Sequence, residues 1–308
     1  MRLHLSLKAG RILGCIIILL FIGAIVFCNM ILCKSSKYVT PENEVNYRQY
    51  IFIPYGEEEK SLGHIGSQSY AYGPGSFAVS VDGSVYVLDS FNRKIKRYTA
   101  GGGFMYSVAL PDKQGGVDFE IKDGTIYLLC NDSGIYTMSP GDKVWTRQGY
   151  SQLKHLAGMF TANGEVYLRS WESGSLQLSS PNGLIFSEAE ASPLKGESLE
   201  SDLFYSCVLR SAGEESYVLL QETLNQKRPY SELRVIKYKG DEIKETALAA
   251  PLEYYIYSNP FKKLYLTQSG DVYQLVPAEN GVIIFYVPWF AGEKTRITEK
   301  LIEENRAK

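Results

Sequence analysis

Gly83-Ser-Val-Tyr86 is the first of four copies of one short sequence motif. The others are Gly124-Thr-Ile-Tyr127, Gly164-Glu-Val-Tyr167 and Gly270-Asp-Val-Tyr273, and a fifth copy with one extra residue is Gly213-Glu-Glu-Ser-Tyr217. In each copy a glycine suited to a turn precedes a strand-forming stretch. Successive tyrosines lie 41, 40, 50 and 56 residues apart. Such a period is typical of one small antiparallel sheet copied around an axis. We therefore predict an all-β protein, a β-propeller of five or six four-stranded blades.

Each copy can be divided into short strands separated by turn residues. The first copy predicts strands at 76–81, 84–89, 94–98 and 104–110. The next two copies predict strands at 118–121, 125–130, 134–138 and 143–148, and at 158–162, 165–171, 175–179 and 184–188. The last two predict strands at 204–210, 217–221, 233–238 and 244–249, and at 262–267, 271–276 and 282–289. Four strands correspond to one blade, so the last copy is one strand short.

The first two strands of three copies are joined by Asp82-Gly83, Asp123-Gly124 and Asn163-Gly164. Both central residues of a type I′ hairpin turn need positive φ, which Asp, Asn and Gly tolerate best. We expect type I′ turns at all three positions, with a structural rather than a binding role. The fourth copy is longer because of polar insertions near 196–202 and 222–231, which we expect to be loops that could hold specificity.

The missing strand of the last copy has a candidate near the start of the repeat region. Residues 50–56 (YIFIPYG) and 62–65 are strand-like and have no partners in the first copy. We predict that this N-terminal segment completes the last blade and closes the ring, because closure removes exposed sheet edges that would invite aggregation.

A second strong signal is an apolar segment near the N-terminus. Residues 12–32 are 21 consecutive residues without a formally charged side chain. At about 1.5 Å per residue this stretch is long enough to cross a hydrocarbon layer of roughly 30 Å. We predict an uncleaved transmembrane signal anchor over residues 12–33. The alternative is a cleaved secretory signal, which needs a shorter apolar region and a small-residue cleavage site, whereas Ile31-Leu32-Cys33-Lys34 follows here.

Charges flanking the apolar segment indicate its orientation. Arg2, Lys8 and Arg11 precede it, and Lys34 and Lys37 follow it. The modest excess of basic residues on the N-terminal side predicts an anchor in the cell membrane with a short cytoplasmic tail (1–11). The rest of the chain after the anchor is then extracytoplasmic. The remainder divides into a polar stalk (34–48), the β-propeller (49–291) and a charged C-terminal tail (292–308).

The net charge argues against one class of partner. The chain has 32 Lys and Arg against 34 Asp and Glu. Residues 1–34 hold four of the basic residues and no acid, which leaves 28 basic against 34 acidic residues beyond them. A nucleic-acid-binding domain is expected to show a clustered basic surplus. We therefore expect no nucleic-acid partner.

Cysteine usage excludes a disulfide framework. Cys15, Cys28 and Cys33 belong to or border the apolar segment, which leaves Cys130 and Cys207 in the large domain. Both lie in apolar strand-like stretches, so buried thiols are expected, with one disulfide between them as the alternative.

One copy resembles a known repeat. Val85-Tyr-Val-Leu-Asp-Ser-Phe-Asn-Arg-Lys-Ile95, followed by Lys96-Arg97-Tyr98 and Gly103-Phe104, is similar to the NHL repeat. The other copies depart from it, with Cys130, Ser170, Gln221 and Val276 at or near the position of Asp89. The resemblance implies a six-bladed or similar propeller of a kind that serves as a binding platform as often as an enzyme. We interpret Asp89, Asn92 and Arg93 as hydrogen-bond partners that form the blade.

The sequence predicts no catalytic, cofactor-binding or metal-ligating residue. Beyond the apolar segment His64 and His155 are the only histidines, too few for a histidine-rich zinc site. A calcium site built from oxygen ligands stays open. Trp145, Trp171 and Trp289 could stack on sugars, although core or blade-edge packing is the simpler use, and Asn131-Asp-Ser133 matches a glycosylation sequon in an expected turn.

These observations lead to one hypothesis and two alternatives. We expect a membrane-anchored extracytoplasmic β-propeller that serves as a binding platform for an envelope or membrane protein or another ligand, without catalysis or cofactor. The first alternative is a calcium-supported hydrolase or lyase with its site on the propeller axis, and the second is a carbohydrate-binding module.

Overall fold

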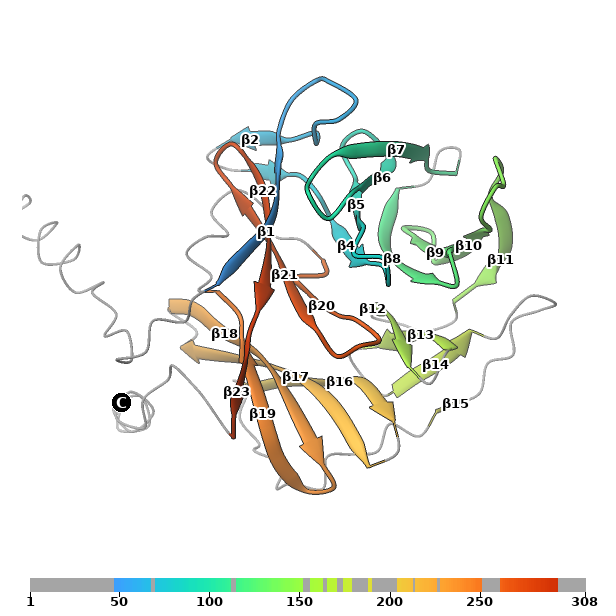
Figure 1. Ribbon diagram of the computed structural model, residues 1–308. Helices are drawn as coiled ribbons and strands as arrows, with labels where there is room; N and C mark the ends of the chain where they lie inside the picture. Colours follow the sequence, from blue (N-terminus) through green and yellow to red (C-terminus); the bar gives the residue numbers. More distant parts are fainter. Residues whose placement is uncertain are drawn as a thin grey trace, which may run out of the picture. The chain divides into compact units, whose positions relative to one another are not determined.

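In a computed structural model, the described residues lie between 47 and 292 and form strands but no helix (Figure 1). The gaps within this range are residues 68–69, 112–114, 152–155, 163–164, 171–173, 179–187, 190–203, 213, 226–227 and 251–260. Residues 45–308 belong to one compact unit. The expected tail, anchor and most of the stalk, and the expected C-terminal tail beyond residue 292, lie outside the described residues. Among the residues that are described, no helix is long and apolar enough to cross a membrane.

The strands form a series of antiparallel sheets, each built mainly from consecutive strands. The first sheet contains β4 (Ser76–Val79), β5 (Val85–Asp89), β6 (Lys94–Tyr98) and β7 (Phe104–Ala109). The second contains β8 (Gly116–Lys122), β9 (Thr125–Cys130), β10 (Gly134–Met138) and β11 (Thr146–Tyr150). The third contains β12 (Leu156–Ala162), β13 (Glu165–Ser170), β14 (Gly174–Leu178) and β15 (Glu188–Ala189).

The remaining sheets include strands that are distant in sequence. The fourth contains β16 (Phe204–Ala212), β17 (Glu215–Asn225), β18 (Arg228–Lys239), β19 (Glu242–Leu248) and, beside β19, β23 (Trp289–Ala291). The last contains β20 (Leu264–Leu266), β21 (Val272–Ala278), β22 (Gly281–Val287) and β1 (Arg48–Pro54). A two-stranded hairpin of β2 (Ile65–Ser67) and β3 (Tyr70–Tyr72) precedes the first sheet.

The first strands of successive sheets contact one another. Contacts join β4 to β8, β8 to β12, β12 to β16, and β20 to β4. The fourth and last sheets share an apolar core to which Leu209 of β16 and Leu264 of β20 both belong. Burial follows the same order, since every residue of β4 is buried whereas none of β7 is. Inner strands that pack in series and outer strands that face solvent are the arrangement of a β-propeller.

The predicted closure by the N-terminal segment is confirmed. β1 pairs with β22 in antiparallel register from Arg48–Tyr286 to Pro54–Gly281 and is the outermost strand of the last sheet (Figure 1). Alternate residues of β1 face the core, so that Ile51 is 3% exposed and Ile53 1% exposed. Within the expected strand at 62–65, Leu62 forms an isolated bridge with Tyr55, and Ile65 begins β2.

The type I′ prediction holds at one turn and is wrong at another. Asp123 and Gly124 both have positive φ, of 51° and 77°, and Lys122 pairs with Thr125, so the connection has two residues. At Asp82-Gly83 only the glycine has positive φ, because strand pairing already ends at Val79–Val85 and the connection is longer. Asn163-Gly164 lies outside the described residues.

Two further predictions of the sequence need correction. Residues 222–231 are not simply a loop, because Glu222–Glu232 and Thr223–Ser231 pairs extend the β17–β18 hairpin. The final strand of the last copy was expected to run from 282 to 289, but β22 ends at Val287, and Trp289 begins β23, which pairs with β19 of the fourth sheet. Pro288 between β22 and β23 offers no amide hydrogen, which is consistent with the chain leaving one sheet there and joining another.

Candidate functional site

A buried charged cluster lies among the inner strands. Asp118 and Glu120 of β8 are 0% and 2% exposed, and Lys262, just before β20, is 7% exposed. The Lys262 ammonium lies 3.1 Å from Asp118 Oδ1 and 2.6 Å from Glu120 Oε1, and it donates to the Phe119 carbonyl at 2.7 Å. The two carboxylates share one face of β8 because side chains two residues apart in a strand point the same way. Lys262 thereby connects the last sheet to the second.

Neighbouring inner strands complete the contacts of Asp118. Oδ1 accepts hydrogen bonds from the Ser76 hydroxyl of β4 and from the Phe119 amide at 2.8 Å. Oδ2 accepts from the Met159 amide of β12 at 2.7 Å. One carboxylate therefore joins the first, second and third sheets, which explains why a charged residue is stable in a fully buried position.

Glu120 is held in a similar way. Its Oε2 accepts hydrogen bonds from the Thr161 and Tyr265 hydroxyls, each at 3.3 Å. Burial raises the pKa of Glu120, and the nearby Lys262 ammonium opposes this shift. Two carboxylates facing one ammonium carry a formal charge of about −1 when both are ionised, a state that burial disfavours. The ammonium also occupies the position between the carboxylates where a bound cation would lie.

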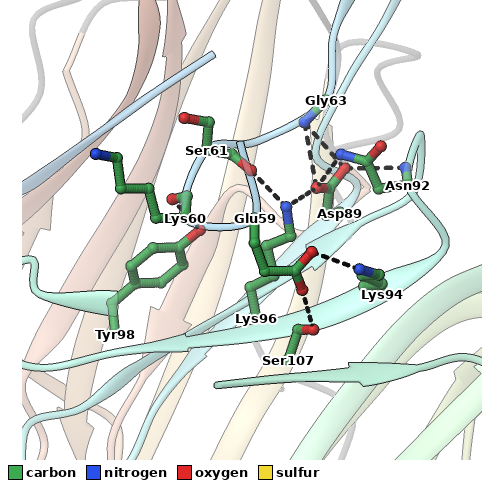
Figure 2. A network of polar contacts seen from close by, with 10 residues as sticks. All are labelled: Glu59, Lys60, Ser61, Gly63, Asp89, Asn92, Lys94, Lys96, Tyr98 and Ser107. Atoms are coloured by element: carbon green, nitrogen blue, oxygen red, sulfur yellow. Dashed lines mark hydrogen bonds and ion pairs between the residues drawn. The ribbon is translucent and has the colours of Figure 1, made fainter. Parts of the chain in front are cut away.

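A second network of polar contacts links residues 59–63, in the segment after β1, to the first sheet (Figure 2). Asp89, which is 0% exposed, accepts hydrogen bonds from the Gly63 amide at 3.2 Å to both oxygens and from Asn92 Nδ2 at 2.7 Å. The Lys96 ammonium lies 2.9 Å from Asp89 Oδ2 and also donates to the Ser61 carbonyl. Asp89 and Asn92 thus make the blade-forming hydrogen bonds expected from the sequence, together with a contact to residues 61–63 that the sequence did not indicate.

The third residue of that prediction, Arg93, has a positive φ of 55° and donates to the Pro111 carbonyl at 3.2 Å. At the edge of the same network, Glu59 accepts from Lys94 at 2.6 Å and from the Ser107 hydroxyl. These contacts favour a structural role for the network, because its donors and acceptors are directed at one another.

An open hollow of about 1010 Å³ lies at one end of the sheets and is lined by their hairpin turns. The turns belong to the first, second and last sheets. They comprise residues 80–83 between β4 and β5, 123–124 between β8 and β9, 139–142 between β10 and β11, and 267–269 and 271 between β20 and β21. Tyr265 lines the hollow while its hydroxyl contacts Glu120, so the hollow adjoins the buried cluster. This volume is at the upper end of ordinary ligand pockets, which are roughly 300–1,000 Å³.

Tyrosine and aspartate dominate the chemistry of the hollow. Four tyrosines and four aspartates line it, namely Tyr86, Tyr106, Tyr265, Tyr273, Asp82, Asp123, Asp142 and Asp271. Among the described residues of the lining, Arg97 is the only basic one, and it lies 2.6 Å from Asp82. Hydrogen bonds from Ser80 and from the Ser84 amide lower the pKa of Asp82 to about 2, so this carboxylate is ionised at neutral pH. Burial raises the pKa of Tyr273 to about 12, which keeps its hydroxyl neutral.

The remaining sequence predictions have structural roles where they can be assessed. Cys130 is a free, buried thiol in the structure, as one of the two expectations had it, and burial raises its pKa to about 12. Trp145 Nε1 donates to the Ala109 carbonyl and Trp289 Nε1 to the Gly270 carbonyl, as packed residues at blade edges do. Asn131-Asp-Ser133 is a turn with Ser133 at a φ of 62°. Trp171 and His155 lie outside the described residues.

The His64 ring stacks on Tyr55 with 4.4 Å between ring centroids. In the described part of the chain, no group of three or more His, Cys, Asp or Glu residues could hold a metal ion. Sequence reasoning missed Asp118, Glu120 and Lys262. The available signal was weak: two carboxylates separated by one residue and flanked by the apolar residues Val117, Phe119 and Ile121.

Comparisons with known proteins identify no family for this chain. No family model matches, and no curated protein matches. Among solved structures, the chain resembles a streptogramin B lyase with 10% identity and a TM-score of 0.41, over 78% of this chain and 93% of the lyase. It resembles glutaminyl cyclase of Myxococcus xanthus with 9% identity and a TM-score of 0.44, over 80% and 97%. A DUF4221 family member of Bacteroides vulgatus shows 11% identity and a TM-score of 0.36, over 82% and 96%. At these scores no activity is carried over to this chain.

Proposed function

We propose that this chain is a single-pass membrane protein whose extracytoplasmic domain is a five-bladed β-propeller that binds a protein or another envelope ligand without catalysing a reaction. Five blades are supported by five sheets of four or five strands in the described residues and by the contact of β20 with β4. The anchor is supported by the uncharged stretch at 12–32 and the orientation by the basic residues before it.

The observation that carries the binding role is the hollow lined by hairpin turns. It is open, it is lined by tyrosines that offer rigid amphipathic contact area, and three of its four aspartates make no ion pair within the described part of the chain. Pockets that combine aromatic walls with a few polar groups are typical binding sites. Asp123 and Asp142 are exposed at the rim, where a ligand can reach them.

The buried cluster favours binding over catalysis on the axis. A catalytic carboxylate must contact substrate, yet Asp118 and Glu120 are at most 2% exposed and are occupied by Lys262 and by groups of the neighbouring strands. The same ammonium takes the place that a calcium ion would need between these two carboxylates. We therefore assign the cluster to holding the sheets together.

The binding role is tested by cross-linking in membranes. Full-length protein and its Asp123→Asn/Asp142→Asn variant are cross-linked mildly and affinity-purified, with Glu279→Gln as the matched control. Glu279 is an exposed carboxylate in the β21–β22 turn and does not line the hollow. We expect one partner to be captured by wild type and by the control and to be reduced at least fivefold by the double variant. A partner captured equally by all three proteins, or by none, would exclude the hollow as the binding site.

The topology is tested separately by protease accessibility. Protease added to intact cells should digest the domain after residue 44 and leave an epitope tag on residues 1–11 protected. Digestion of the tag but not of the domain would reverse the orientation, and release of the domain into the medium without detergent would replace the anchor with a cleaved signal.

A further inference from the structure

The hollow has an unbalanced charge that indicates the kind of ligand it takes. Among the described residues, the charged side chains of the lining are Asp82, Asp123, Asp142, Asp271 and Arg97, which gives a formal charge of −3 from four carboxylates and one guanidinium. Arg97 is already paired with Asp82. In the described part of the chain, the other three aspartates make no ion pair. A concave surface of one charge sign raises the local concentration of ligands of the opposite sign.

The chain's own Arg97 shows how the walls accommodate a cation. Its guanidinium lies 2.6 Å from Asp82 Oδ2, and its central carbon lies 5.1 Å from the Tyr86 ring centroid and 5.7 Å from that of Tyr106. A planar guanidinium is suited both to carboxylate pairing and to stacking on aromatic rings. One part of the hollow therefore already binds such a group through aspartate and tyrosine.

The part of the lining that the last sheet contributes repeats these residue types, and no cation of the described residues pairs with its aspartate, Asp271. Asp271 is fixed by the Ser269 hydroxyl, which donates to its Oδ2 at 2.6 Å, and by the Tyr286 hydroxyl, which donates to Oδ1 at 3.4 Å. The ring of Tyr286, whose hydroxyl contacts Asp271, lies 5.6 Å from the Tyr273 ring, centroid to centroid, which places Asp271 in an aromatic environment. A carboxylate oriented by hydroxyl donors beside tyrosine is prepared to accept a second cationic group.

We infer that the hollow binds a polypeptide segment that presents arginine or lysine side chains. This inference rests on the proposed binding role and adds the chemical class of the ligand. A volume of about 1010 Å³ accommodates a short extended segment rather than a single side chain. Peptide recognition of this kind joins charge pairing with aromatic contact. A neutral oligosaccharide could also contact tyrosine, but it would leave the three unpaired aspartates without a counter-charge.

The test uses full-length protein in detergent and three acetylated, amidated hexapeptides. The first is Gly-Arg repeated three times, the second replaces Arg with the uncharged isostere citrulline, and the third replaces Arg with Glu. We expect the arginine peptide to bind at least tenfold more tightly than the citrulline peptide, with affinity that falls as salt rises. The glutamate peptide should show no binding. The disaccharides cellobiose and chitobiose are tested in the same binding assay, as ligands for the carbohydrate alternative.

The variants assign the effect to the hollow. Asp123→Asn/Asp142→Asn should weaken arginine-peptide binding at least tenfold, whereas Glu279→Gln should not change it. Asparagine is suitable at 123 because it tolerates the positive φ of 51° that Asp123 adopts. Equal binding of the arginine and citrulline peptides, equal loss in all variants, or binding of the disaccharides alone would overturn the inference. If the cross-linked partner depends on Asp123 and Asp142 but no arginine peptide binds, the ligand class is wrong and the proposed binding role stands.

Discussion

The Lys262 ammonium lies 2.6 Å from Glu120 Oε1 although 142 residues separate the two in the chain. The contact joins the segment before β20 to β8 and therefore the last sheet to the second, across the inner strand of the first. The contact therefore requires the last, first and second sheets to be packed together.

Replacing Lys262 with Met should destabilise the domain strongly. The variant leaves Asp118 and Glu120 as two buried carboxylates with no cation, and breaking a buried pair in this way costs about 3–5 kcal/mol. The free energy of unfolding is measured by urea titration. Lys60→Met is the control, because its ion pair with Glu58 is exposed to solvent and should contribute little to stability. Equal effects of the two substitutions would contradict the assigned role of Lys262.

Replacing Glu120 with Gln should change how stability depends on pH. Burial raises the pKa of Glu120 above its ordinary value of 4.5, so the folded protein binds this proton more readily than the unfolded chain. Stability is then lost as pH rises from about 4.5 through the folded pKa. Asp118, Lys262, Thr161 and Tyr265 are the groups that face Glu120.

In Glu120→Gln this loss should disappear. Melting temperatures of wild type and variant, recorded from pH 4 to pH 9, should diverge in favour of the variant as pH rises. Glu279→Gln, whose carboxylate is exposed, should follow the wild-type curve. Parallel curves for wild type and Glu120→Gln would show that Glu120 keeps an ordinary pKa in the folded protein.

Asp89→Asn should separate the segment at 61–63 from the first sheet. Lys96, which is 1% exposed, would lose its carboxylate partner, and we expect a loss of about 3 kcal/mol in the free energy of unfolding. Glu59→Gln, at the exposed edge of the same network, should cost less than about 1 kcal/mol. Hydrogen exchange should also show faster exchange of the Gly63 amide in Asp89→Asn, and an unchanged rate would argue against the contact.

Removal of residues 50–66 should unfold the domain, because β22 would lose the partner that closes the last sheet. The milder Ile53→Ala variant should cost about 2–5 kcal/mol, since Ile53 is 1% exposed. Phe52→Ala is the matched control on the other face of β1, where Phe52 is 42% exposed, and should cost much less. A soluble deletion product with an unchanged melting temperature would refute closure by this segment.

The repeated glycine-containing motif was sufficient to predict the sheets, because turns and strands are determined by residues that are neighbours in the sequence. The bounds of β6, β9 and β10 agree with the predicted strands at 94–98, 125–130 and 134–138. β11 begins three residues later than predicted, at Thr146. Closure by β1 was also predictable, because one copy lacked a strand and an unpartnered segment was present.

The site could not be predicted to the same extent. The cluster joins Asp118 and Lys262 from different sheets, and the hollow combines turns from three sheets. Residues that far apart in the chain form no recognisable sequence motif. The pairing of β23 with β19 was missed for the same reason. Single charged residues in strands were visible, but only the fold shows which of them meet.

The pairing of β1 with β22 also has a consequence for synthesis. The ribosome makes β1 first, yet its partner emerges roughly 230 residues later. At about 5–20 residues per second, this interval is on the order of ten seconds or more. Until then, β1 lacks the strand beside which Ile51 and Ile53 are buried in the folded domain. The apolar residues of β1 therefore have no partner strand until translation is nearly complete. We expect a chaperone to bind this segment of the nascent chain during that interval.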